Sequence, residues 1–235
     1  MTEPELLRTR VEIVRQRLED ACAKAGRSPS EVILCAASKT QTPATIAQVA
    51  QLSIDAFGEN RVQELVANRA ANSYGSTPLH FIGHLQTNKV KQIVGSACLI
   101  QSVDSEKLLR AIDKEAAKQQ LVQDILLEVN LAGEENKSGV SPKALPALAE
   151  LCEQLSGVRV RGLMCVPPRT SDETAQHRAF ETLRHLSDNL ALRGYDRVQM
   201  EHLSMGMSGD FESAIAEGST IVRIGTAIFG PRNYQ

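Results

Sequence analysis

Lys39 is the residue of this sequence best suited to covalent chemistry. It directly follows a run of seven mostly apolar residues (32–38) that predicts a buried strand, whereas the other eight lysines fall in predicted helices or polar loops. An ammonium group at such a strand end is partly desolvated, and the neutral amine that desolvation favours condenses with a carbonyl carbon. The alternative is a lysine whose ammonium extends from the rim of the sheet into solvent.

Two glycine-containing segments near the C-terminus predict a phosphate site. Residues 204–210 (SMGMSGD) precede a predicted short helix at 211–217, and the N–H groups at a helix N-terminus suit an anion. Ser208 adds a hydroxyl donor. Gly225 and Thr226 stand at the end of the next strand, so both segments can contact one phosphate. The alternative is an ordinary glycine turn in which Asp210 caps the helix.

Arg223 is the third candidate, because it interrupts the apolar run 221–224. A buried guanidinium needs a planar or anionic partner, and Arg223 shares a strand face with Gly225 because side chains alternate. The alternative is an outward arginine that pairs with a helix carboxylate. Glu59 could serve as an acid or a base, but carboxylates are common at helix starts. His80 lies in an apolar run and is more typical of the core than of catalysis.

Eight short apolar, β-branched runs predict the strands that position these side chains. Their near-continuous apolar character is typical of a parallel sheet covered on both faces, and each gap holds the dozen or more residues that a crossover needs. Eight such units without a dividing linker predict one domain over residues 1–235, an α/β (TIM) barrel with functional groups at the carboxyl ends of its strands. The runs are 32–38, 54–57, 79–83, 98–103, 124–131, 158–166, 197–203 and 220–225.

The N-terminal segment 1–26 is predicted to supply the eighth outer helix. Eight strands within 32–230 enclose only seven helices, and the sequence ends within ten residues of the last strand. A helix over residues 3–25, followed by Gly26, would bury one apolar stripe against the barrel near strands eight and one. That stripe includes Leu7, Val11, Val14 and Leu18. Further helices are predicted at 172–193 and from Ser141 onward, with Pro142 near its first position.

Composition excludes several other classes of protein. A net charge of −2 and 3% aromatic residues without tryptophan do not suit nucleic-acid binding. The sequence contains no run of 18 or more apolar residues, so no membrane helix is predicted. The charged N-terminus is not expected to be a signal peptide. Five cysteines without a C-x-x-C pair predict reduced thiols in a cytoplasmic protein, and no metal site.

The motifs around these candidates, taken together and in order, resemble one family. The sequence is similar to the pyridoxal 5′-phosphate (PLP) homeostasis proteins of the YggS type, whose barrel resembles the N-terminal domain of alanine racemase. The motifs that carry the resemblance are ASKT (37–40), FGENRVQE (57–64), HFIGHLQTNK (80–89), VNLAGEENKSG (129–139), RGLMCVPP (161–168), LSMGMSGDFESAI (203–215) and GSTIVRIGTAIFG (218–230).

The resemblance implies a fold-type III PLP barrel in which Lys39 forms the internal aldimine. It implies phosphate contacts from Ser208, Gly225 and Thr226, with Arg223 facing the pyridine nitrogen and with Asn60 and Ser204 close to the cofactor. An arginine there disfavours protonation of that nitrogen and weakens PLP as an electron sink. We therefore expect a monomeric carrier or reservoir of PLP without substantial turnover, which exchanges the cofactor transiently with apo PLP-dependent enzymes. No residue is expected to be catalytic.

Three other functions compete with this hypothesis. The first is a PLP racemase or decarboxylase. Racemases of the related fold use a tyrosine as second base, supplied by a further β domain across a dimer. Here the only tyrosines are Tyr74, Tyr195 and Tyr234, so we expect no second base. A Schiff-base aldolase acting on a sugar phosphate fits Lys39 and the phosphate segments equally well, but the family motifs disfavour it. A pure interaction protein leaves Lys39 and Arg223 unexplained.

Overall fold

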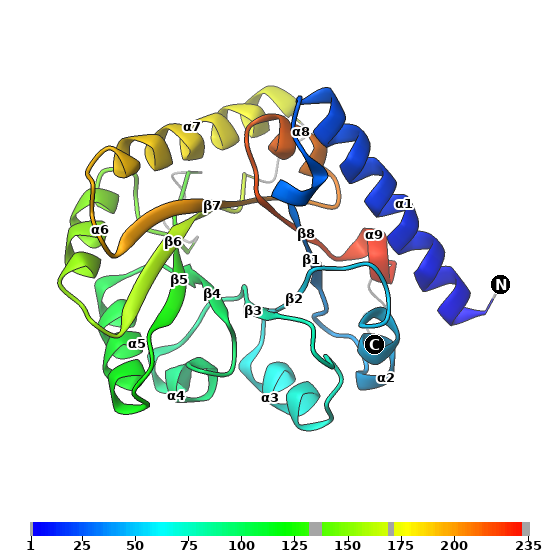
Figure 1. The fold of residues 1–235 in the computed structure, drawn as a ribbon, viewed down its shortest axis with the longest axis horizontal. Helices are drawn as coiled ribbons and strands as arrows, with labels where there is room; N and C mark the ends of the chain where they lie inside the picture. Colours follow the sequence, from blue (N-terminus) through cyan, green and yellow to red (C-terminus); the bar gives the residue numbers. More distant parts are fainter. Residues whose placement is uncertain (1, 132–137, 169–171, 232–235) are drawn as a thin grey trace.

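Eight parallel strands close into a barrel (Figure 1). The computed structural model describes residues 2–131, 138–168 and 172–231. The strands pair in chain order and β1 pairs with β8, which confirms the predicted α/β barrel. Their bounds are β1 Ile33–Ala37, β2 Ala56–Glu59, β3 Leu79–Phe81, β4 Leu99–Val103, β5 Gln123–Glu128, β6 Val158–Met164, β7 Val198–Met207 and β8 Ile221–Ile224.

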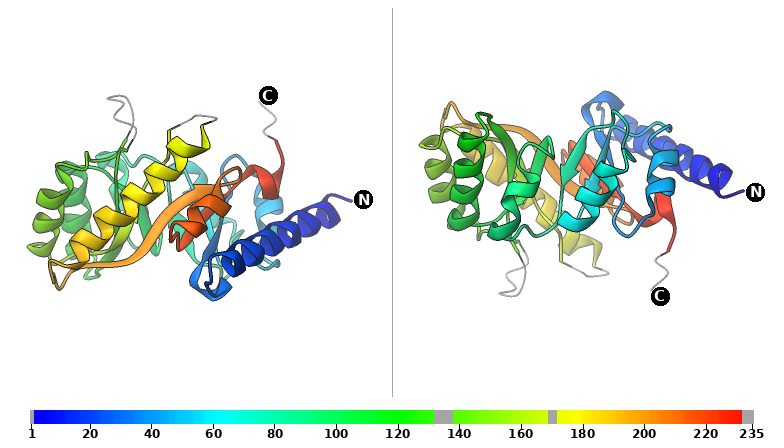
Figure 2. Two further views of the ribbon diagram at one scale, coloured as in Figure 1. Left: turned by 90° about the horizontal axis from the view of Figure 1, so that it is seen from above. Right: turned by 90° about the horizontal axis from the view of Figure 1, so that it is seen from below.

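An outer layer of helices surrounds the strands (Figures 1 and 2). The connection between β3 and β4 consists of a 3-10 turn (Thr87–Lys89) and one short helix. The helices are α1 Glu3–Lys24, α2 Pro43–Val49, α3 Val62–Ala70, α4 Val90–Ile93, α5 Glu106–Lys118, α6 Leu145–Glu153, α7 Glu173–Ala191, α8 Phe211–Ala216 and α9 Thr226–Phe229. No helix in the described part of the chain is both long and apolar enough to cross a membrane.

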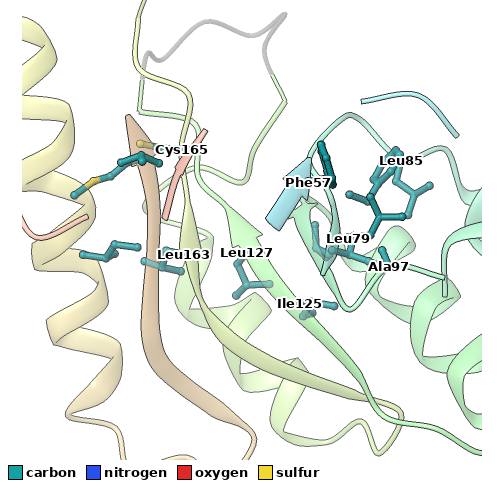
Figure 3. Packing of buried hydrophobic residues seen from close by; sticks show 14 of the residues in the cluster. Phe57, Leu79, Leu85, Ala97, Ile125, Leu127, Leu163 and Cys165 are labelled. Atoms are coloured by element: carbon teal, nitrogen blue, oxygen red, sulfur yellow. The ribbon is translucent and has the colours of Figure 1, made fainter. Parts of the chain in front are cut away.

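The two faces of the strands contribute to two buried clusters, as the period-two alternation requires. One cluster contains strand residues alone, among them Cys35, Leu126 and Ile221, and it fills the inside of the barrel. The other joins outward strand residues such as Leu127 and Leu163 to helix residues, and Figure 3 shows part of it.

Helix α1 lies on the outside of the barrel as predicted, but it packs mainly on helices α8 and α9 (Figures 1 and 2). Its apolar stripe from Leu7 to Leu18 is buried, and the Arg17 guanidinium lies 4.8 Å from the ring centroid of Phe211 in α8. We expected direct packing on strands eight and one. The sequence count missed α9, a single turn after β8, and this turn contributes to the surface on which α1 rests.

Strand β7 is longer than predicted, because it continues through residues 204–207, which we expected to form a loop. The register shifts on both sides of β7 accommodate this extension. At Gly206 the strand approaches α8 so closely that a Cβ would lie 2.7 Å from the Ala214 Cβ, and its φ of +93° is one that glycine adopts easily. The loop proper is therefore only Ser208 to Asp210.

Helix α6 begins at Leu145, later than the predicted start at Ser141. Residues 142–144 form a turn in which the Ser141 carbonyl accepts the N–H groups of Ala144 and Leu145. Pro146, rather than Pro142, occupies the first turn of the helix, where its missing N–H has no intrahelical partner to lose.

Candidate functional site

One cavity of about 420 Å³ lies at the carboxyl end of the barrel, between the ends of β1, β2, β6, β7 and β8. Its volume falls in the range of small-molecule pockets. Six of the seven residues predicted to bind a cofactor line it: Lys39, Asn60, Ser208, Arg223, Gly225 and Thr226. Ser204, the seventh, is fully buried behind Arg223. The apolar part of the lining includes Ile82, Met164, Met207 and Phe229.

Lys39 reaches the cavity from the end of β1, where it continues the inward-facing positions of Cys35 and Ala37. The next residue, Thr40, has a φ of 65°, which is rare for a β-branched residue. Its N–H donates to Glu64 Oε2 of α3 at 2.9 Å. The backbone turn that sets the direction of Lys39 is therefore held from the neighbouring βα unit.

Glu59 does not belong to the cavity, although it precedes Asn60. It lies on the outer face of β2, where its Oε1 accepts hydrogen bonds from Ser38 Oγ (2.7 Å) and Tyr74 Oη (2.9 Å). Its Oε2 has no partner among the described residues, and burial raises the pKa of the carboxyl group. This arrangement joins β1, β2 and the segment after α3, so the side chain has a structural role.

The Arg223 guanidinium is buried at the floor of the cavity with 5% of the residue exposed. Nη1 donates to Ser204 Oγ at 2.5 Å and Nη2 donates to the Cys165 carbonyl at 2.7 Å. Both partners are neutral, and burial lowers the pKa of the guanidinium. A charged group that is held in this way favours a ligand that presents a hydrogen-bond acceptor to it.

Ser208, Gly225 and Thr226 meet at the β7–β8 side of the cavity. Ser208 Oγ accepts the N–H of Ala227 at 3.3 Å, which joins the loop after β7 to the turn α9. Asp210 makes no capping hydrogen bond to α8, and its Oδ1 instead accepts the Met207 N–H at 2.5 Å. The two segments therefore lie together and form one small polar surface.

Asn60, directly after β2, carries an unused acceptor. Its Oδ1 is buried and has no hydrogen-bond partner among the described residues. A buried polar atom without a partner costs free energy, and a ligand donor in the cavity would remove that cost. Gly83 supports Asn60 from behind, since a Cβ there would lie 2.0 Å from the Asn60 carbonyl oxygen.

A second cavity, of about 520 Å³, opens near the amino-terminal ends of β3, β4 and β5. Its lining includes Arg69, Tyr74, Cys98 and Gln123, and no lysine is among the lining residues. The carboxyl-end cavity, in contrast, combines an amine, a buried guanidinium and small polar groups. It suits a compact molecule that has a carbonyl group, a hydrogen-bond acceptor for the guanidinium and an anionic group.

Comparisons with known proteins decide the family. The sequence profile described as alanine racemase, N-terminal domain, matches residues 12–233. A pyridoxal phosphate homeostasis protein of Aquifex aeolicus is 46% identical, with 96% of this chain and 98% of that protein covered. The chain belongs to the pyridoxal phosphate homeostasis protein family.

Solved structures place this pyridoxal phosphate homeostasis family member beside two other barrels. PipY of Synechococcus elongatus PCC7942, solved with PLP bound, is 32% identical with a TM-score of 0.80, and 91% of this chain and 100% of that chain are covered. The alanine racemase of Clostridium difficile 630 has a TM-score of 0.77 at 13% identity, with 98% of this chain and 58% of that chain covered. The racemase likeness concerns the fold alone.

Sequence reasoning missed Gln101, which supports Arg223 from inside the barrel through the predicted site residue Ser204. Gln101 is fully buried, its side chain contacts both Ser204 and His80, and neither Gln101 nor Ser204 lines the cavity. The signal was present, since a glutamine interrupts the apolar run 98–103. His80 lies in the core as expected.

Proposed function

We propose that this protein binds PLP through Lys39 and serves PLP homeostasis as a carrier or reservoir. The observation that carries the proposal is the meeting of Lys39, Arg223 and Ser208 around one cavity of about 420 Å³. A relative that is 32% identical over nearly the whole chain has PLP bound. The names of other relatives, at 46% and 41% identity, support the homeostatic role.

The groups in the cavity fit the functional groups of PLP. Its aldehyde condenses with primary amines, and Lys39 provides one. Arg223 would donate to the pyridine nitrogen, and the unused acceptor of Asn60 Oδ1 would take a ligand donor. Ser208, Gly225 and Thr226 would hold the phosphate through hydroxyl and backbone donors. Ser204 would act from behind, through its hydrogen bond to Arg223.

Arg223 is also the reason for proposing little or no catalytic turnover. A guanidinium stays charged, so a proton on the facing ring nitrogen would meet a second positive charge in a poorly solvated place. The neutral ring is a weaker acceptor of electrons from a bound amino acid. The residue therefore favours holding and exchanging the cofactor over making and breaking bonds at an α-carbon.

No tyrosine among the cavity-lining residues offers a second base for racemisation. The hydroxyl of Tyr74 is bonded to Glu59 on the outer face of the sheet, and Tyr195 lies in the connection between α7 and β7. Tyr234 falls outside the described residues.

We further propose that residues 1–235 act as one domain, as a monomer that meets apo PLP-dependent enzymes transiently.

Binding of PLP and of pyridoxal to the purified protein tests the proposal. The wild-type protein should give a visible absorption band with PLP that Lys39→Ala abolishes. The control Lys91→Ala removes an exposed lysine of α4 and should keep the band. Loss of one hydrogen bond to a charged group costs roughly 1.5–3 kcal/mol, so Ser208→Ala should weaken PLP about tenfold or more and leave pyridoxal unaffected. Equal affinity of the wild type for PLP and pyridoxal would contradict the phosphate site.

A further inference from the structure

A chain of hydrogen bonds crosses the inside of the barrel beneath Arg223. Arg223 Nη1 lies 2.5 Å from Ser204 Oγ, which lies 2.6 Å from Gln101 Oε1. Gln101 Nε2 lies 2.8 Å from His80 Nδ1. All four residues are at most 5% exposed, and they come from β8, β7, β4 and β3. The chain thus links strands on opposite sides of the barrel.

The chemistry of the four groups determines which atom donates and which accepts in each of these hydrogen bonds. Arginine has no acceptor, so Ser204 Oγ must accept from Arg223. The single hydroxyl hydrogen of Ser204 is then directed to Gln101 Oε1, which turns the amide N–H₂ toward His80. His80 must accept at Nδ1 and is therefore the neutral tautomer with its proton on Nε2. Burial, which lowers the pKa of His80 to about 4, agrees with a neutral imidazole.

A purely structural role would not require these polar groups. The inner cluster of the barrel consists of apolar residues such as Leu99, Leu126 and Met164, and Glu128 is a further buried polar residue on its face. Apolar side chains of similar volume would bury there without hydrogen-bond requirements, whereas each buried polar group must find a partner. Arg223, which faces the cavity, is the one charged residue among the four that these hydrogen bonds connect. The chain therefore ends at the group that would meet the cofactor ring.

We propose that Gln101 is a positioning residue that fixes the Arg223 guanidinium against the cofactor ring through Ser204. This inference rests on the proposed function. By accepting the Ser204 hydrogen, Gln101 keeps the lone pairs of Ser204 directed at Arg223. One nitrogen of the guanidinium is thereby held by Ser204 and another by the Cys165 carbonyl. Two fixed nitrogens define the plane of the group, which sets the direction of its remaining donors.

Substitutions of Gln101 distinguish the effect of its hydrogen bonds from the effect of its side-chain volume. Gln101→Met keeps the approximate volume and removes both hydrogen bonds. Gln101→Glu restores them, because a carboxyl group can accept from Ser204 and share one proton with His80 Nδ1. The matched control is Gln123→Met, which removes a glutamine that is also buried and hydrogen-bonded but borders the cavity at the other end of the barrel.

PLP affinity and the pH dependence of the visible band are measured for each variant. Gln101→Met should weaken PLP about tenfold and move the pH-dependent change of the band upward, because a loosely held guanidinium opposes ring protonation less. Gln101→Glu should restore both values, and Gln123→Met should match the wild type in both. If Gln101→Met does not fold, His80→Phe removes the hydrogen bond between His80 and Gln101 instead. This variant should move the pH profile of the band in the same direction.

Three results in the glutamine variants would overturn the proposal. They are a Gln101→Met protein with wild-type affinity and pH profile, a Gln101→Glu protein as impaired as Gln101→Met, and a Gln123→Met protein impaired to the same extent. In the His80→Phe protein, an unchanged profile would count against it equally. Failure of the proposed function looks different, because the wild-type protein itself would then give no band with PLP.

Discussion

Substitution of Glu128 by glutamine should change how the stability of the protein depends on pH. Glu128 ends β5 on the same face as Leu126 of the inner cluster, and it is 6% exposed. The pKa of its carboxyl group is raised from 4.5 to about 7, chiefly by burial; the charge of Asp104 also raises it and that of Arg223 lowers it. The group therefore loses its proton less readily in the folded chain than in the unfolded chain.

The direction of the effect follows from proton linkage. An acid whose pKa is raised by folding contributes stability that is fully present below pH 4.5 and is lost as the pH rises through about 7. At 1.36 kcal/mol for each pKa unit, the loss amounts to about 3 kcal/mol. Glutamine does not titrate, so the Glu128→Gln protein should not show this loss. Its free energy of unfolding, measured relative to that of the wild type, should rise by about 3 kcal/mol from about pH 4 to about pH 8.5.

Urea unfolding of both proteins without added PLP, at a series of pH values, measures this difference. Glu150→Gln is the matched control, since it removes the same charge at an exposed position of α6. Parallel stability curves for Glu128→Gln and the wild type would refute the reasoning, because they would mean that Glu128 titrates alike in the folded and unfolded chains. A gain that Glu150→Gln reproduces would refute it as well.

Three further predictions concern the cavity wall, the packing of α1 and the absence of turnover. Gly83→Ala should weaken PLP binding in a titration, because its Cβ would lie 2.0 Å from the Asn60 carbonyl oxygen. The control Gly162→Ala makes an equally tight contact (1.9 Å) away from the cavity and should lower stability only. Leu18→Ala should lower the unfolding free energy by about 2–5 kcal/mol with PLP affinity unchanged, and a loss below about 1 kcal/mol would mean that α1 is not firmly packed. Chiral analysis of alanine after long incubation with the PLP-loaded protein should detect no turnover, and many turnovers that Lys39→Ala abolishes would contradict the non-catalytic proposal.

The barrel could be predicted because its strands carry a strong local signal. Runs such as 32–38 and 98–103 are apolar on both faces, which only a covered parallel sheet requires. The ends of the elements were less accessible. Strand β7 passes through Gly206 to Met207, because shifts in its pairing with β6 and β8 extend it, and pairing shifts leave no mark in a single strand. Helix α9 is too short to show a helical period.

The residues that face the cavity could be predicted in part from the alternation of strand side chains. Lys39 and Arg223 each continue an inward series, and both line the cavity. The connection of Arg223 to Gln101 could not be predicted, because it depends on how strands across the barrel are staggered. Glu59 and Asn60 follow the alternation, since Asn60 lines the cavity while its neighbour Glu59 faces the outer layer.

The site of covalent attachment tests the central claim most directly. The PLP-loaded protein is reduced with borohydride, which makes the link between a lysine amine and the cofactor aldehyde permanent, and the modified peptide is mapped by mass spectrometry. The account predicts one pyridoxyl adduct on Lys39, and none in Lys39→Ala. An adduct found mainly on Lys89 or another lysine, or equal labelling of the Lys39→Ala protein, would contradict it.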